Sequence, residues 1–309
     1  MYKTIYAVAP YNHGINFKMQ AYEAWEKTGG KTMPTHYPWR VFHKFAYDYE
    51  LPTFHKSNKI AQLRFVEPVS MNFDTFPDYA RYEIIPIIWD CWPQFFEMTC
   101  QWFIKHDVRT AIFTSSQTAN RMKERFPEMN ILTITEGIDI ARYNEGKELS
   151  QRKIDVLEFG RSNGLFKEGF ESNIVHLHSD GKKKMFQSDE EFYSALENSK
   201  ITVCLPRCDT DSQLAGNIET LTQRYWEAML SRIVIVGRAP KELVSYIGYN
   251  PIVEVNRENA VDQVYEIIRH IEDYQSLVDK NRQIALEMGD WTIRMNFIRH
   301  SLTNLKYII

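Results

Sequence analysis

The sequence lacks several features that would assign it to a common class of protein. Its 37 Lys and Arg residues are slightly outnumbered by 40 Asp and Glu residues, and the net charge is −3. A general nucleic-acid binder would carry a basic excess, so we expect no nucleic-acid partner. No run of roughly eighteen apolar residues occurs, and the N-terminus has no basic segment followed by an apolar one. We therefore expect neither a membrane-spanning helix nor a signal peptide.

Cysteine is scarce and follows no recognisable metal pattern. The four cysteines are Cys91, Cys100, Cys204 and Cys208, with no Cys-x-x-Cys pair and no histidine at a zinc-finger spacing. Reduced cysteines in a cytoplasmic protein are the simplest interpretation. No internal repeat is evident either.

Length and composition indicate two globular domains. The chain has 309 residues, more than one hydrophobic core usually supports, and 44% of them are hydrophobic, which is enough for two cores. The stretch 144–153, NEGKELSQRK, is almost entirely polar, as expected of a hinge between domains. We place an N-terminal domain at 1–148, a C-terminal domain at 149–290 and a closing helix at 291–309.

The N-terminal half begins with the pattern of an α/β domain. An apolar strand at 5–9 leads into a loop that contains His13 and Gly14, and a helix is expected at about 16–27. A strand, a glycine-containing turn and a helix open a doubly wound domain, whose ligands bind beyond the carboxyl ends of the strands. Residues 32–82 are rich in aromatic residues and prolines. Two or three strands fit there, but periodicity does not order them.

Asp90 is a candidate functional residue of this half. The stretch 83–93 is expected to be a buried strand whose C-terminal end presents Asp90, and a helix is expected at 94–106. A carboxylate in this position can pair with an acceptor hydroxyl or act as a base. Its alternative interpretation is an N-cap or turn residue.

The stretch 214–237 carries the strongest functional pattern. We expect a tight loop at Gly216 and Asn217, a helix of roughly three turns through Glu227, and a buried strand at 233–236 ended by Gly237. Glu219 is expected where the loop meets the helix, since free backbone N–H groups and the helix dipole favour an anion there. Seven residues separate the two glutamates. This layout suits a sugar joined to a diphosphate.

The Glu-x7-Glu spacing resembles a known signature. It overlaps Trp-Glu-Ala-Met at 226–229 and is followed by the apolar strand and Gly237. It is similar to the donor site of retaining nucleotide-sugar glycosyltransferases of the GT-B fold, the large family four. The resemblance covers the C-terminal half and is only architectural over the first half. It implies an α/β protein with two doubly wound, Rossmann-like parallel-sheet domains that face a cleft. The first domain would bind the acceptor and the second the donor, and the closing helix would cross back to the first.

The resemblance also implies a pair of cations after the strand at 154–159. Arg161 and Lys167, six apart and preceded by Gly160, resemble the family's basic pair, which grips the donor diphosphate. As the glycosidic bond breaks, charge collects on the departing diphosphate, and fixed cations stabilise it. Lys167 has the alternative interpretation of a solvated loop lysine. The glycines of 160–169 do not form a Walker loop, because no Gly-Lys-Ser/Thr follows them.

The two glutamates complete the implied site. Glu227 would accept both ribose hydroxyls, since an ionised carboxylate can take two hydrogen bonds from a vicinal diol, and Glu219 would bind hydroxyls of the transferred sugar. An ordinary helix glutamate is the alternative for Glu227, and a turn-capping histidine is the alternative for His13. The other implied contacts are the backbone N–H groups of Thr220, Leu221 and Thr222 with phosphate, Arg207 with phosphate or sugar, and His13 and Gly14 with the acceptor or the transferred sugar.

No metal is expected. Asp209, Asp211 and Glu219 are possible hard-metal ligands by residue type, but their loop has no glycine at a calcium-loop position. The donor, a UDP- or GDP-sugar, is therefore a substrate, and we expect no cofactor beside it.

The function implied is transfer of a hexose or amino-hexose from a nucleoside diphosphate sugar to a saccharide or lipid-linked saccharide acceptor, with retention. Bacterial surface polysaccharide synthesis is the expected setting, in the cytoplasm with at most peripheral contact at the inner face of the membrane. One rival is a nucleotide-sugar epimerase or inverting transferase that uses Asp90 or His13 as its base. Another is a non-catalytic GT-B subunit that binds a glycan or a partner protein.

Overall fold

The computed structural model describes residues 2–10, 16–34, 56–160, 164–166, 169–178 and 185–309. The chain folds into two compact units, each built around its own parallel sheet. Unit 1 contains Met1–Glu136, Gln213–Thr220 and Trp291–Ile309, and unit 2 contains Gly137–Ser212 and Leu221–Asp290. The contacts thus divide the chain after Glu136 and add 213–220 to unit 1, whereas the sequence analysis placed one boundary at 148.

The sheet of unit 1 has six strands in the order β2-β1-β3-β4-β5-β6, and every pair is parallel. Since β1 lies between β2 and β3, the strand order reverses beside β1, at a topological switch point. Most of the strands are continuous apolar runs, as expected of strands covered on both faces. Their bounds are β1 Thr4–Val8, β2 Thr32–Met33, β3 Ile60–Val66, β4 Glu83–Ile88, β5 Thr110–Phe113 and β6 Asn130–Thr133.

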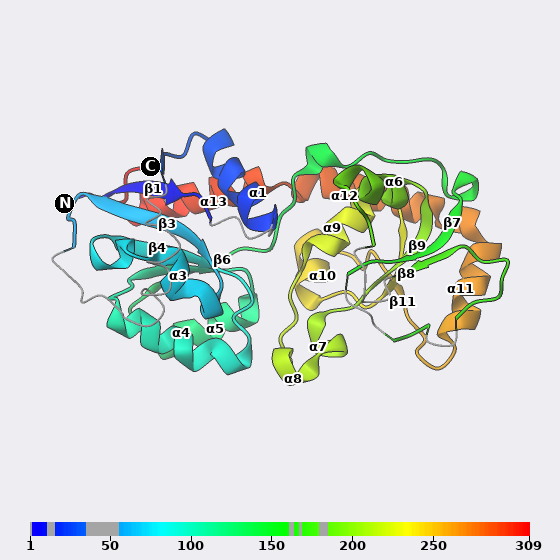
Figure 1. Ribbon diagram of the computed structural model, residues 1–309, viewed down its shortest axis with the longest axis horizontal. Coiled ribbons are helices and arrows are strands. Elements are labelled where there is room, and N and C mark those ends of the chain that lie inside the picture. Colours follow the sequence, from blue (N-terminus) through cyan, green and yellow to red (C-terminus); the bar gives the residue numbers. More distant parts are fainter. Residues whose placement is uncertain (1, 11–15, 35–55, 161–163, 167–168, 179–184) are drawn as a thin grey trace. The chain divides into compact units, whose positions relative to one another are not determined.

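Helices cover both faces of this sheet (Figure 1). Helices α1 (Asn16–Lys27) and α13 (Trp291–Asn304) pack on one face, where Trp25, Phe65, Trp89 and Trp291 form a buried core. Helices α4 (Pro93–Lys105) and α5 (Ser116–Arg125) pack on the other, over a second buried cluster. Short helical segments connect β3 to β4, namely η1 (Pro68–Ser70), α3 (Met71–Thr75) and η2 (Asp78–Ala80).

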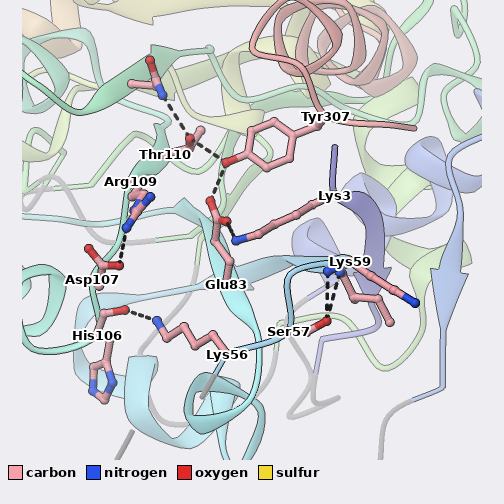
Figure 2. A network of polar contacts seen from close by, with 12 residues as sticks. Lys3, Lys56, Ser57, Lys59, Glu83, His106, Asp107, Arg109, Thr110 and Tyr307 are labelled. Carbon is pink, nitrogen blue, oxygen red and sulfur yellow. Dashed lines mark hydrogen bonds and ion pairs between the residues drawn. The ribbon is translucent and has the colours of Figure 1, made fainter. Parts of the chain in front are cut away.

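The C-terminal tail is fastened to the edge of unit 1 at which β4 and β5 begin. Figure 2 shows Tyr307 pointing at Glu83, which also pairs with Lys3. The Tyr307 hydroxyl lies 3.2 Å from the hydroxyl of Thr110. The next residue, Ile308, accepts a backbone hydrogen bond from Ile5 of β1 and donates one to Lys3, directly before that strand. This network lies opposite the carboxyl ends of the strands, so it stabilises the unit and leaves the ligand side of the sheet untouched.

Unit 2 has a five-stranded parallel sheet in the order β11-β10-β9-β7-β8. Its switch point lies between β7 and β9, because β8 is on one side of β7 and the later strands are on the other. The strands are β7 Ile154–Glu158, β8 His176–His178, β9 Ser199–Cys204, β10 Val234–Gly237 and β11 Val253–Glu254. The predicted α/β class with two doubly wound parallel sheets is therefore confirmed.

Two clusters of apolar side chains lie on the two faces of this second sheet. Helices α6, α9 and α10 contribute to one cluster, and α11 contributes to the other (Figure 1). Helix α12 packs against α9, and Val278 near its start joins the cluster of α11. The bounds are α6 Asp189–Glu197, α9 Gln223–Leu230, α10 Lys241–Ile247, α11 Ala260–Arg269 and α12 Gln275–Met288.

Two local predictions were wrong. The helix that carries Glu227 has eight residues instead of three turns, because Thr222 is still extended, with a ψ of 162°, and the helix begins at Gln223. The segment after β9, expected as a loop, forms two single helical turns, α7 (Arg207–Thr210) and α8 (Ser212–Ala215). No helix in the described part of the chain is long and apolar enough to cross a bilayer.

Candidate functional site

The carboxyl ends of β7, β9 and β10 meet the first turn of α9 in unit 2. Strands β9 and β10 approach closely where they end, since a Cβ atom on Gly237 would lie 1.9 Å from the carbonyl oxygen of Cys204. Only glycine fits at this position. The Cys204 thiol lies 3.9 Å from the backbone oxygen of Arg224, which brings α9 to the same edge. In open α/β sheets this edge, at the switch point, is where ligands bind.

Arg224 lies over the backbone of Gly160, the residue after β7 that the sequence analysis assigned to the site. Gly160 has a φ of +83°, and a Cβ there would lie 3.2 Å from Nη1 and 3.3 Å from Cδ of Arg224. A larger residue at 160 would have to displace the guanidinium. The backbone beyond β7 and a cation on α9 therefore lie together at the switch point.

Glu227 follows Arg224 by three residues on the same helix. Neighbours three apart lie on one face of a helix, so the cation and the carboxylate are adjacent. Burial raises the pKa of Glu227 to about 7, against the opposing effects of the Tyr143 hydrogen bond and the Arg224 charge. The Tyr143 hydroxyl donates to Oε1 at 3.2 Å. The carboxylate is desolvated, although Glu227 as a whole residue keeps part of its surface exposed.

The structure places the other glutamate differently from the expectation. Glu219 belongs to unit 1, and its backbone N–H donates to Oε1 of Gln117 at 2.6 Å. The side-chain amide of Gln117 also donates to the carbonyl of Asn217, at 3.1 Å. Glu219 does not lie at the start of a helix, because residues 219–222 have no helical structure and α9 begins only at Gln223. Its predicted contact with the transferred sugar stays a prediction.

The predicted phosphate cradle of Thr220, Leu221 and Thr222 also lies ahead of the helix. The N–H of Leu221 donates to the carboxylate of Glu242 at 3.3 Å, so this amide already has an anionic partner. The first backbone N–H groups of α9 belong instead to Gln223 and Arg224. The hydroxyl of Thr222 is buried and has no hydrogen-bond partner within the described part of the chain.

Asp90 lies in unit 1, directly beyond β4, in a left-handed conformation with a φ of 51°. Asp tolerates this conformation better than most residues, as its alternative role in a turn requires. Its backbone oxygen accepts a hydrogen bond from the N–H of Trp92 at 2.8 Å. Asp90 borders a cavity of about 10 Å³ beside Thr114, Ser115 and Thr220, which is room for a single water molecule.

Arg207 and the acidic residues after it take part in ion pairs. Arg207 contacts the carboxylate of Asp211 at 3.1 Å. Asp209 receives Arg238 at 2.7 Å and Arg257 at 3.3 Å, and hydrogen bonding to Arg238 lowers the pKa of Asp209. Asp209 and Asp211, two of the three possible metal ligands, thus have cationic partners.

Four residues of the predicted site, His13, Gly14, Arg161 and Lys167, lie outside the described residues, and their roles stay predictions. Conversely, the structure adds Arg224 and Tyr143, which the sequence analysis missed. The spacing of Arg224 and Glu227 along one helix was a usable signal for the first. Tyr143 is far from Glu227 in the sequence, and no pattern pointed to it.

No family model matches this sequence, and no curated protein matches it. Solved structures do match. HepE of Anabaena, in complex with UDP-glucose, aligns with a TM-score of 0.62 at 9% identity, over 97% of this chain and 99% of HepE. Sucrose-phosphate synthase from Thermosynechococcus elongatus aligns with a TM-score of 0.60 at 11% identity, over 98% and 100% of the two chains. TarM aligns with a TM-score of 0.52 at 14% identity, over 79% of this chain and 54% of TarM, so the chain spans about half of that protein. These likenesses confirm the predicted GT-B fold.

Proposed function

We propose that the protein is a glycosyltransferase that uses a nucleoside diphosphate sugar as donor, and that unit 2 binds the nucleotide. The observation that carries the proposal is the arrangement of Glu227, Arg224 and Gly160 at the switch point of the unit 2 sheet. A carboxylate for a diol, a cation for phosphate and a glycine that permits close approach are the groups a nucleotide needs. HepE, which shares the fold, is solved with UDP-glucose.

In the proposed complex, Glu227 accepts hydrogen bonds from the two ribose hydroxyls. The free N–H groups at the start of α9 and the dipole of that helix favour the diphosphate. Arg161 and Lys167 remain the predicted cations of the loop after β7, and Glu219 remains the predicted partner of the transferred sugar.

The proposed reaction breaks the bond between the anomeric carbon and the diphosphate oxygen, whose electron pair stays with that oxygen. The acceptor hydroxyl oxygen forms the new bond to the anomeric carbon, and its proton passes to the departing phosphate. Attack on the face that the diphosphate leaves would retain the anomeric configuration. Asp90, in unit 1, is the proposed partner of the acceptor hydroxyl.

The acceptor we propose is a saccharide, either free or lipid-linked, as in the assembly of bacterial surface polysaccharides. The enzyme would then work in the cytoplasm, with peripheral contact at the inner face of the membrane for a lipid-linked acceptor. These finer assignments rest on the resemblance of the 214–237 stretch.

A thermal-shift screen against UDP, GDP, ADP and their sugars tests the proposal, because a ligand that binds only the native state raises its stability. One nucleotide should raise the melting temperature. The corresponding nucleotide sugar should be hydrolysed slowly without acceptor, and Glu227→Ala should abolish both effects. Binding without turnover would favour the non-catalytic alternative. No stabilisation by any nucleotide would refute the proposal.

A further inference from the structure

Arg224 differs from the other arginines near the strand ends of unit 2. Arg207, Arg238 and Arg257 each form an ion pair with an aspartate. Arg224 forms no ion pair with any carboxylate in the residues that the structure describes, although it is only partly exposed. Its side chain lies over Gly160 at the switch point, where an added Cβ would be 3.2 Å from Nη1. A guanidinium in this position has donors to spare for an anion.

A second polar group at the same helix end makes no hydrogen bond within the described ranges. Thr222 immediately precedes α9, and its hydroxyl is buried without a hydrogen-bond partner in the described ranges. An N-cap threonine usually accepts from a backbone N–H of the first turn, but this one makes no such bond. A buried polar group without a partner costs free energy, so the Thr222 hydroxyl, like the Arg224 guanidinium, is a group at the start of α9 that can hydrogen-bond to an anion.

The spacing of these groups suits a nucleotide laid along the first turn of α9. Arg224 and Glu227 are three residues apart, slightly less than one turn, which is about 4.5 Å along the helix axis. In a nucleoside diphosphate the ribose diol and the phosphates are separated by a comparable length. A ribose on Glu227 would therefore bring its diphosphate towards Arg224 and Thr222.

We propose that the Arg224 guanidinium, assisted by the Thr222 hydroxyl, binds the donor diphosphate and stabilises the charge it gains when the glycosidic bond breaks. This inference rests on the proposed function and adds to it a cation carried by α9 itself. The planar guanidinium can hold two phosphate oxygens at once, which a lysine ammonium cannot reproduce. The alternative is that Arg224 only balances the charge of Glu227.

The test compares ligands that differ only in the diphosphate. Binding of UDP, uridine and inorganic pyrophosphate is measured by calorimetry on the full chain, with GDP and guanosine or ADP and adenosine if the screen selects another base. Arg224→Ala should weaken nucleoside diphosphate binding by about tenfold to a hundredfold, as expected for hydrogen bonds between charged groups. It should change nucleoside binding by less than about twofold, and Arg224→Lys should fall between the two.

Thr222→Val keeps the shape of the side chain and removes its hydroxyl. It should weaken nucleoside diphosphate binding by several-fold, leave nucleoside binding unchanged, and raise the melting temperature of the free protein, because an unsatisfied buried hydroxyl is lost. Arg257→Ala, which removes an exposed arginine paired with Asp209, is the matched control and should change none of these affinities.

Each outcome decides one of the claims. If Arg224→Ala weakens nucleoside and nucleoside diphosphate equally, Arg224 acts only through Glu227 and the inference is wrong. It is also wrong if neither affinity changes. If the unaltered protein binds no nucleoside diphosphate or pyrophosphate, the proposed function fails, and the inference with it. Melting temperatures of the variants show that each one is folded.

Discussion

Replacing Glu227 by glutamine should stabilise the protein at pH 8. Burial raises the pKa of Glu227 from 4.5 to about 7. The unfolded chain therefore loses this proton at lower pH than the folded one, and the free energy of unfolding falls as the pH rises from about 4.5 to about 7. At roughly 1.4 kcal/mol per pKa unit, the ionised carboxylate costs up to about 3 kcal/mol above pH 7. Glutamine has the same shape and carries no charge, so the variant escapes that cost.

The measurement is the free energy of unfolding of the unaltered protein and of Glu227→Gln, each at pH 5 and pH 8. Comparing the two proteins at the same pH cancels the contribution of the other titrating groups to the free energy of unfolding. We expect the variant to gain about 1–3 kcal/mol at pH 8 and little at pH 5, and to bind nucleoside at least about tenfold more weakly at pH 8, since the ribose loses a charged acceptor. Equal stabilities at pH 8, or a variant that is less stable there, would show that burial does not disfavour the ionised form of Glu227 in the folded protein.

Three further changes test other parts of the structure. Burial and the nearby charge of Lys56 lower the pKa of His106 (Figure 2) from 6.5 to about 4. The free energy of unfolding should therefore decrease as the pH falls from 6.5 to 4, and His106→Phe should make this decrease smaller in urea titrations. Gly237→Ala should cost more than about 3 kcal/mol of unfolding free energy, because its Cβ would strike Cys204. The control Gly169→Ala, at a φ of +75° and with no described atom within 4 Å of its Cβ, should cost about 1 kcal/mol. Gln117→Ala should speed hydrogen exchange at the Glu219 amide by roughly tenfold, and exchange that stays unchanged would show that the Gln117 contact does not hold this loop.

Much of the fold could be predicted because its signals are local. Buried parallel strands such as β4 and β10 are short apolar runs, and the amphipathic helices α11 and α12 repeat their apolar residues at the helical period. The helix that carries Glu227 was found for the same reason. Its start was misplaced, because the helical pattern was extended through Thr220 and Leu221, which are buried by tertiary contacts without being helical.

The details of the candidate site were less accessible because they depend on contacts between distant segments. Gln117 and the amide of Glu219 are 102 residues apart in the chain, and Tyr143 and Glu227 are 84 apart. No periodicity links such pairs. Arg224 was missed for a related reason. It was singled out because it lies over Gly160 and forms no ion pair with a described carboxylate. Both become visible only once β7 and α9 are set side by side.

The central claim is that the switch point of the unit 2 sheet binds a nucleoside diphosphate. Hydrogen exchange of the full chain, with and without the nucleotide that the thermal-shift screen selects, tests it most directly. We expect protection to concentrate at the amides of 158–160 and 223–227, and to disappear in Glu227→Ala. Protection confined to other strands of either sheet, or protection that survives in Glu227→Ala, would contradict the claim.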